Sequence, residues 1–151
     1  MLWYKVCCMI FSMHLSKLNK EKLKIMVVND EEDILMLYSD YFSNRGHQVL
    51  KTYLTAENVM DDIERESPDI YVIDHKLPGT KEGIDLAIEI LAKYPSAPIL
   101  FVTANEYLES ELSKHRIFDG KKLKVLLKPA RLQQIENDMS DLVREEPYPK
   151  V

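Results

Sequence analysis

Short apolar runs alternate with longer stretches of helical period along most of this chain, and this alternation constrains the fold more than any other feature. The runs are rich in β-branched residues and occupy residues 24–28, 49–53, 70–73, 99–102 and 123–127. Three of them are almost continuously apolar, which is typical of strands covered on both faces. The run at 49–53 mixes polar and apolar positions and is therefore predicted to be an edge strand.

The stretches between the runs place apolar residues on one helical face. Four are well defined, with apolar positions at Ile34, Leu37, Tyr38, Tyr41 and Phe42; at Ala56, Val59, Met60 and Ile63; at Ile84, Ala87, Ile88 and Leu91; and at Leu132, Ile135, Met139, Leu142 and Val143. A weaker helix is predicted from Tyr107 to about Arg116. The alternation predicts an α/β fold in which a doubly wound, five-stranded parallel sheet carries five helices.

The composition fits a single globular domain of 151 residues with 46% hydrophobic content. The net charge of -5 argues against nonspecific binding of nucleic acid. We predict an N-terminal extension at 1–22, the folded domain at 23–145 and a C-terminal tail at 146–151. Since only 22 residues follow Pro129, we expect no DNA-binding domain and a stand-alone domain.

The N-terminal segment has an apolar core that resembles part of a signal peptide, but it is too short to span a membrane. It lacks a cleavage site of small residues, so it is either an extra segment or a mis-assigned start with Met13 as the initiator. Cys7 and Cys8 are adjacent and offer neither metal-site spacing nor a disulfide framework. We therefore expect a reduced, cytoplasmic protein without a membrane span.

Polar side chains follow four of the apolar runs directly, at the edge of a parallel sheet where ligands bind. These are Asn29 and Asp30, Asp74, Thr103, and Lys128. Taken singly, each has a structural explanation: Asn29 or Thr103 could cap a helix, and Lys128 could be a solvated strand end. The acids that follow Asp30 suit the first turn of a helix. The coincidence of these polar residues from four strand ends at one edge of the sheet favours a shared site.

Asp30 and Asp74 would repel each other unless a divalent cation lay between them, and Mg²⁺ binds one or two carboxylates while it keeps water and phosphoryl ligands. Lys128 would add a positive charge for phosphoryl oxygens and Thr103 a hydroxyl donor. The inventory is that of an aspartyl-phosphate site, in which one of the two carboxylates is a plausible acceptor for the phosphoryl group.

Four motifs in order make the chain resemble the receiver domain of two-component response regulators: KIMVVNDEEDI, PDIYVIDHKLPG, ILFVTA and LLKP. The resemblance implies a flavodoxin-like strand order of 2-1-3-4-5 and a cis peptide bond at Lys128-Pro129. It implies that Asp74 accepts phosphate from a sensor histidine kinase, a phosphotransfer protein or a small phosphodonor. Mg²⁺ would be held by Asp30, by Asp74 and by the backbone carbonyl of Lys76.

Three departures from the family pattern are present. Asn29 stands where the family usually has an acid that acts through a metal-bound water, so we predict weaker Mg²⁺ binding. Val125 replaces the aromatic residue that relays phosphorylation, which puts that relay in doubt. The segment from Asn105 to Lys122 is longer than usual and predicts a remodelled fourth helix. Lys76 and Asn105 match variable positions that influence how long the phosphate survives.

Three functions remain open at this stage. The first is a phosphorylatable receiver, not an enzyme beyond its self-catalysed phosphoryl acceptance and loss, that signals to an unknown downstream protein. The second is a receiver-like module that works without phosphate. The third is a Mg²⁺-dependent aspartyl-phosphate hydrolase, although Lys76 occupies the position where a haloacid-dehalogenase-like enzyme needs a second Asp. A weak homodimer through the fourth and fifth helices is also left open.

Overall fold

A five-stranded parallel sheet forms the centre of the computed structural model, which describes residues 21–144. The strands are β1 (Lys24–Val28), β2 (Gln48–Tyr53), β3 (Ile70–Ile73), β4 (Ile99–Thr103) and β5 (Leu123–Leu127). Their order in the sheet is β2-β1-β3-β4-β5, and every adjacent pair is parallel. The predicted fold class and strand order are confirmed, and β2 lies at an edge as its mixed sequence predicted.

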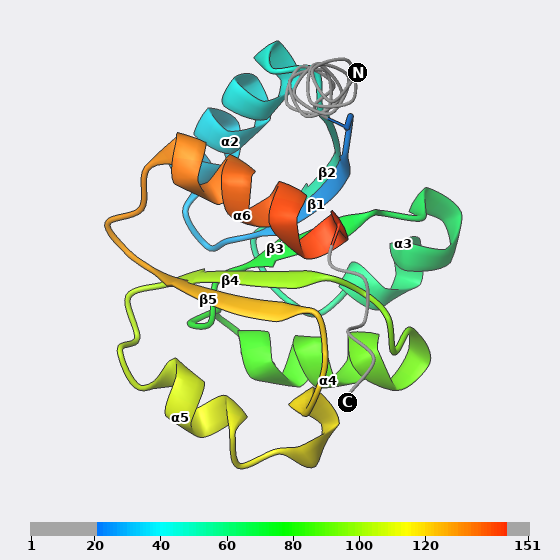
Figure 1. Cartoon of the computed structure of the whole chain (residues 1–151), viewed down its shortest axis with the longest axis vertical. Coiled ribbons are helices and arrows are strands. Elements are labelled where there is room, and N and C mark those ends of the chain that lie inside the picture. Colours follow the sequence, from blue (N-terminus) through cyan, green and yellow to red (C-terminus); the bar gives the residue numbers. More distant parts are fainter. Residues whose placement is uncertain (1–20, 145–151) are drawn as a thin grey trace, which may run out of the picture.

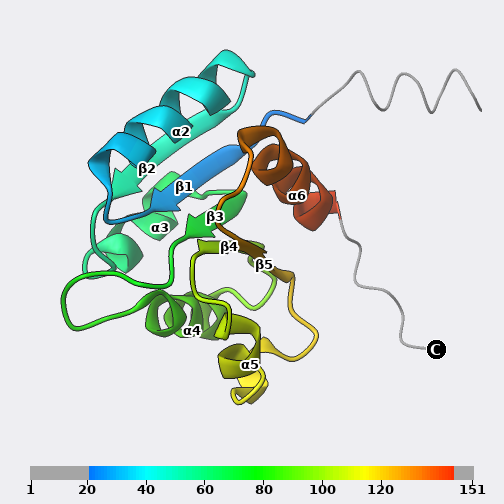
Figure 2. The ribbon, with the colours of Figure 1, turned by 90° about the vertical axis from the view of Figure 1, so that its left-hand side faces the viewer.

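Helices cover both faces of the sheet. They are α2 (Glu32–Asn44), α3 (Val59–Glu66), α4 (Gly83–Lys93), α5 (Leu108–Leu112) and α6 (Leu132–Arg144). Figure 1 shows α2 and α6 on one side of the strands and α4 and α5 on the other, and Figure 2 shows the same two layers from the side. The predicted extension at 1–22 and tail at 146–151 lie almost wholly outside the described residues.

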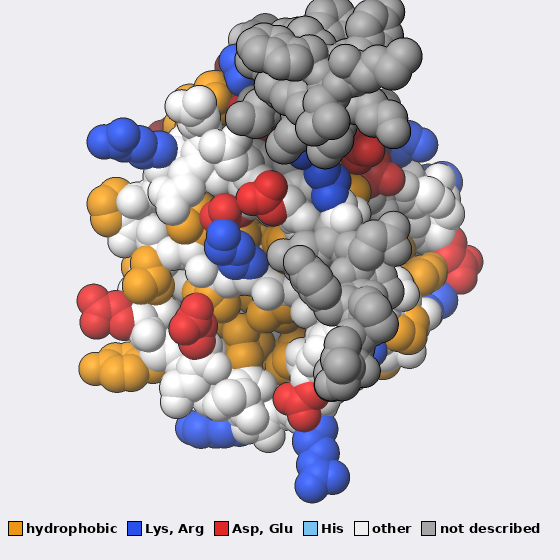
Figure 3. Space-filling model, viewed as in Figure 1, with side chains coloured by type: hydrophobic (Ala, Val, Ile, Leu, Met, Phe, Trp, Pro, Cys, Tyr) orange, Lys and Arg blue, Asp and Glu red, His pale blue; other side chains and the backbone are white. Residues whose placement is uncertain are grey.

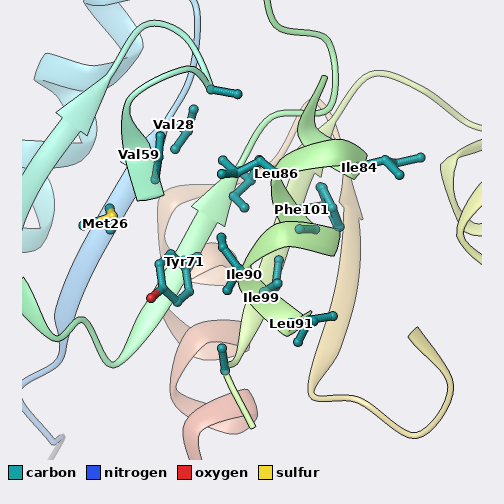
Figure 4. Packing of buried hydrophobic residues seen from close by; sticks show 14 of the residues in the cluster. Met26, Val28, Val59, Tyr71, Ile84, Leu86, Ile90, Leu91, Ile99 and Phe101 are labelled. Atoms are coloured by element: carbon teal, nitrogen blue, oxygen red, sulfur yellow. The ribbon is translucent and has the colours of Figure 1, made fainter. Parts of the chain in front are cut away.

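Alternate residues of the central strands enter two separate apolar cores. Met26, Tyr71 and Phe101 pack toward α3, α4 and α5, whereas their neighbours Ile25 and Val72 pack toward α2 and α6. Figure 4 shows the first of these cores, in which Leu86 and Ile90 of α4 lie against the strands. Burial on both faces explains why β1, β3 and β4 read as continuous apolar runs.

Two helices differ from the sequence prediction. Leu37 was assigned to the apolar face of α2, but it is 47% exposed, and the buried positions of that helix are Leu35, Tyr38 and Phe42. The weak helix predicted from Tyr107 to about Arg116 ends at Leu112. A short 3-10 helix at Arg116–Phe118 follows, because Phe118 is the next residue that reaches the core. The predicted remodelling of this segment therefore takes the form of a short α5 and an irregular connection.

Candidate phosphorylation site

A cavity of about 600 Å³ lies at the carboxyl ends of the strands, where the sequence placed the site. The connections that leave β1 and β3 toward it are seen at the left of Figure 2. Predicted residues from all four strand ends reach this cavity, and its lining is Asp30, Glu31, Asp74, His75, Lys76, Glu82, Thr103, Ala104, Asn105, Glu111 and Lys128. Of the predicted residues only Asn29 is absent from this lining, because it is buried beside Asp74.

Asp74 is held by hydrogen bonds with residues at the ends of β1 and β5. Its backbone N–H donates to the carbonyl of Val28 at 2.9 Å, which continues the pairing of β3 with β1. The ammonium of Lys128 donates to Oδ2 at 2.7 Å, and the amide of Asn29 donates to the same oxygen at 3.4 Å. Within residues 21–144, no donor bonds to Oδ1. One carboxylate oxygen is therefore fixed and the other is left for a ligand.

Asn29 does not cap α2 as one interpretation of the sequence allowed. Its Oδ1 accepts a hydrogen bond from the backbone N–H of Glu31 at 2.8 Å, and Glu31 is the residue that precedes the first turn of the helix. The side-chain oxygen of Asn29 thus shapes the turn between β1 and α2, while its amide nitrogen faces Asp74. An amide oxygen has two lone pairs, so the second remains for a water molecule.

Lys128 is not a solvated strand end. The peptide bond from Lys128 to Pro129 is cis, as predicted, and the backbone N–H of Lys128 donates to the carbonyl of Thr103 at 2.8 Å. The side chain then turns inward to Asp74, with 27% of its surface exposed. The β5 edge therefore contributes the cation of the site.

Thr103 is almost fully buried at the end of β4, and its hydroxyl faces the loop before α5. Oγ1 accepts from the backbone N–H of Asn105 at 3.1 Å, and Oδ1 of Asn105 accepts from the N–H of Tyr107 at 3.0 Å. Tyr107, not Thr103, is the residue directly before α5, so the capping interpretation of Thr103 is wrong. The hydroxyl is instead linked to the start of α5 through one asparagine.

A buried phenol borders the site on the side of α2. Burial raises the pKa of Tyr38 to about 12, and the charges of Asp74 and Glu31 act in the same direction. Tyr38 is therefore neutral at physiological pH. It is not part of the cavity lining, and it adds no charge beside the site.

His75 and two glutamates form a wall that the sequence analysis missed. His75 is buried, and its Nε2 lies 3.5 Å from Oε2 of Glu111 and 3.7 Å from Oε2 of Glu82. Its Nδ1 is buried and has no hydrogen-bond partner among the described residues. The signal available in the sequence was the histidine directly after Asp74. Its partners could not be read from the sequence because they come from α4 and α5.

The loop after Asp74 is tied down at both ends. Thr80 donates to Oε1 of Glu57 from its backbone N–H at 2.9 Å and from its hydroxyl at 3.0 Å. The first of these bonds is the main reason that the pKa of Glu57 is lowered. Gly83 donates to the carbonyl of His75 at 2.8 Å, and a Cβ at Gly83 would lie 2.5 Å from the carbonyl oxygen of Asp74. Only glycine lets α4 begin this close to Asp74.

The donor set of the cavity suits Mg²⁺ better than a transition metal. Within residues 21–144, no three His, Cys, Asp or Glu side chains are placed to hold a metal ion. Asp30 and Asp74 nevertheless line the same cavity, together with Lys76, whose backbone carbonyl was predicted as a ligand. Mg²⁺ is bound in many proteins by one or two carboxylates and keeps several waters. The residues present therefore fit a magnesium ion with one carboxylate fewer than usual.

The comparisons with known proteins agree with the fold. The model of the response regulator receiver domain matches residues 25–140. Over 83 residues the chain is 32% identical to the regulatory protein VanR of Enterococcus faecium, an alignment that covers 55% of this chain and 35% of VanR. The chain thus spans about a third of the length of this curated relative.

Solved structures share the fold at low sequence identity. The CheY-like receiver protein of Methanospirillum hungatei superposes with a TM-score of 0.69 at 21% identity, covering 82% of this chain and 94% of that one. The receiver domain of NtrX from Brucella abortus gives 0.68 at 23%, covering 82% and 100%. The BeF3-activated receiver domain of RstA from Klebsiella pneumoniae gives 0.68 at 20%, covering 81% and 99%.

Proposed function

Because the chain belongs to the response regulator receiver domain family of two-component systems, we propose that Asp74 accepts a phosphoryl group from a histidine kinase or a phosphotransfer protein. The observation that carries this proposal is the asymmetry of the Asp74 carboxylate. Lys128 and Asn29 hold Oδ2, whereas Oδ1 has no donor from residues 21–144, in a carboxylate that lines the cavity. A nucleophile needs a free lone pair in a fixed direction, and Oδ1 has one.

The transfer is a direct displacement at phosphorus. A bond forms from a carboxylate oxygen of Asp74 to phosphorus while the bond from phosphorus to the donor nitrogen breaks, and its electron pair stays on the departing imidazole. Lys128 and the hydroxyl of Thr103 would bind the phosphoryl oxygens and stabilise their charge. Asp30, Asp74 and the carbonyl of Lys76 would hold Mg²⁺, with Asn29 acting through a water. When bound, this ion supplies the positive charge that lets an anionic donor approach two carboxylates.

The signal would leave the site through α5 and reach a downstream protein. Val125 occupies the position of the usual aromatic relay and is packed at the edge of the core under α5. A shift of the Thr103 hydroxyl toward a bound phosphoryl group would break its bond to the N–H of Asn105. Since Asn105 also accepts from the N–H of Tyr107, the start of α5 would respond. This route needs no aromatic residue at Val125.

The test is to incubate the protein with Mg²⁺ and a small phosphodonor and to map the adduct by mass spectrometry. We expect a hydroxylamine-labile phosphoryl adduct at Asp74 that is absent from Asp74→Asn. If wild type and Asp74→Asn behave alike, the receiver-like module that works without phosphate replaces this proposal. The observation that favours such a module is the hydrogen bond from the amide of Asn29 to Asp74. Multiple turnover of a phosphoester that Asp74→Asn abolishes would indicate a hydrolase.

A further inference from the structure

The lining of the cavity carries more negative than positive charge. Its ionisable side chains, apart from His75, are the carboxylates of Asp30, Glu31, Asp74, Glu82 and Glu111 and the ammonium groups of Lys76 and Lys128. The proposed chemistry uses Asp30, Asp74 and Lys128. Glu82 and Glu111 have no part in it, yet both reach the same cavity, from the start of α4 and from α5.

His75 explains why two glutamates from different helices gather here. Its side chain is 8% exposed, and its Nε2 faces a carboxylate oxygen of each glutamate, at 3.5 Å from Glu111 and 3.7 Å from Glu82. The glutamate side chains remain 40% and 55% exposed. Their charges are therefore presented at the mouth of the cavity rather than neutralised inside the protein, and they act through water on whatever enters.

We propose that Glu82 and Glu111 make this site selective for phosphodonors of low negative charge, such as the monoanion phosphoramidate, over dianionic acyl phosphates. The inference rests on the proposed function of Asp74 and names the class of donor that Asp74 uses. His75 is the positioning residue that keeps both carboxylates at the entrance. A dianion must pass this pair, whereas a phosphoramidate, whose protonated nitrogen leaves it a monoanion, meets a smaller barrier.

Neither chemical step involves Glu82 or Glu111, so for each donor the change in rate between wild type and variant reports on approach and binding. In each case an Asp74 oxygen forms a bond to phosphorus. With acetyl phosphate the phosphorus–oxygen bond breaks and acetate departs with the electron pair. With phosphoramidate the phosphorus–nitrogen bond breaks and the already protonated nitrogen departs with the pair as ammonia. Neither reaction needs another reactant.

The experiment compares phosphorylation rates of wild type and the double variant Glu82→Gln with Glu111→Gln, using acetyl phosphate and phosphoramidate in Mg²⁺ at low and high salt. Gln keeps the size of the side chain and leaves the bond from the N–H of Glu82 to Asp85 intact. We expect about a tenfold gain with acetyl phosphate at low salt and about threefold or less with phosphoramidate, both shrinking at high salt. Glu109→Gln, on α5 but outside the cavity lining, is the matched control and should change neither rate.

The outcomes separate this inference from the proposed function. An equal gain with both donors, a gain that salt does not alter, or no gain at all in a protein that is phosphorylated at Asp74 would overturn the selectivity and leave the phosphoacceptor in place. A gain that Glu109→Gln reproduces would do the same, since it would reflect net charge alone. Absence of any adduct in wild type and every variant would instead remove the proposed function and the selectivity with it. Melting temperatures of all variants show that folded proteins are compared.

Discussion

Two buried carboxylates in this protein, Asp74 and Glu136, are held in opposite ways. Glu136 of α6 is fully buried beside the starts of β1 and β2, and its Oε1 lies 3.1 Å from Nε2 of His47 and 3.3 Å from Nε of Arg45. Its Oε2 accepts from the hydroxyl of Tyr41 at 3.5 Å. Asp74 is almost as buried, but all the donors that the described residues provide bond to a single oxygen.

The difference separates a carboxylate whose two oxygens are both bonded within the protein from one that leaves an oxygen open to the cavity. His47 accepts from the backbone N–H of Leu23 through Nδ1, so in the neutral ring the proton lies on Nε2 and is donated to Glu136. Each oxygen of Glu136 is thereby satisfied within the protein. Asp74 keeps an oxygen without such a bond on the lining of a cavity, where a ligand can reach it.

The largest expected effect is on folding. Glu136→Ala leaves Arg45 and His47 without their buried partner and should lower the free energy of unfolding by about 3–5 kcal/mol. Asp74→Ala removes the acceptor of a lysine that can turn to solvent and should change it by less than about 1 kcal/mol. Urea denaturation of both variants checks this. Equal losses would show that the two carboxylates do not differ as described; Glu136→Gln serves if Glu136→Ala does not fold.

Two lysines near β5 allow the same comparison to be made for the rate of phosphorylation. Lys128 donates to Asp74 at 2.7 Å, and Lys124 donates to the buried Asp138 of α6 at 2.6 Å. Lys128→Ala removes a donor that would bind the transferring group and should slow phosphorylation by about a hundredfold, whereas Lys124→Ala should leave the rate unchanged. The measurement is the initial rate of adduct formation with phosphoramidate. A loss of similar size in both variants would indicate damage to the sheet edge.

Asn29→Asp should strengthen Mg²⁺ binding by about tenfold, since it restores a charge next to Asp74. The added carboxylate would repel Asp74 when no cation is bound, so the melting temperature should fall without Mg²⁺ and rise more steeply with it than in wild type. Calorimetric titration and thermal melts measure the two effects. Asp40→Asn, an exposed change on α2 away from the cavity lining, is the control. An affinity equal to that of wild type would remove Asn29 from the metal site.

The smallest expected effect is the pH dependence of the stability that Asp62 contributes through its bonds to Lys51 and Tyr53. Hydrogen bonds from Lys51 and Tyr53 lower the pKa of Asp62, so its stabilising contribution is present above its unfolded pKa of about 3.9 and is lost as the pH falls through the lower folded value. Asp62→Asn should therefore lower the melting temperature slightly at pH 7 and by less at pH 3. Asp61→Asn, an exposed neighbour, should do neither. A difference that persists unchanged at pH 3 would show that this carboxylate contributes by packing, not by charge.

Much of the site could be predicted because its residues follow buried strands directly. A position immediately after an apolar run in a parallel sheet is fixed by topology, which is why Asp30, Asp74, Thr103 and Lys128 were assigned to one edge. Such positions do not reveal hydrogen bonds. The sequence left open whether Lys128 was solvated, and only the fold brought its ammonium to Asp74 across 54 residues.

The errors have a common physical cause. Periodicity gives the spacing of an apolar face but not its width, so Leu37 was placed in the core although neighbouring elements leave it exposed. The length of α5 depended on where Phe118 could reach the core. His75 gathered Glu82 and Glu111 because α4 and α5 pack on the same face of the sheet, as seen in Figure 1. Each outcome depends on contacts between elements.

The distribution of charge on the surface could not be read from the sequence either. On the face drawn in Figure 3, acidic and basic side chains lie interspersed, so the net charge read from the sequence does not describe any one region. The acidic mouth of the cavity arises from helices that are distant in sequence. No helix within the described range is long and apolar enough to cross a membrane.

By itself the sequence determined the α/β alternation, the edge position of β2 and the identity of the residues at the strand ends, because hydrophobic period and strand termini are local properties of the chain. Only the tertiary structure decided which carboxylate is satisfied and which is left open. The sequence places Asp74 directly after an apolar run and Glu136 in a mixed helical stretch, but it does not show which donors either carboxylate will meet. What distinguishes them is which donors the fold brings within hydrogen-bond distance, and those donors lie 45 to 95 residues away.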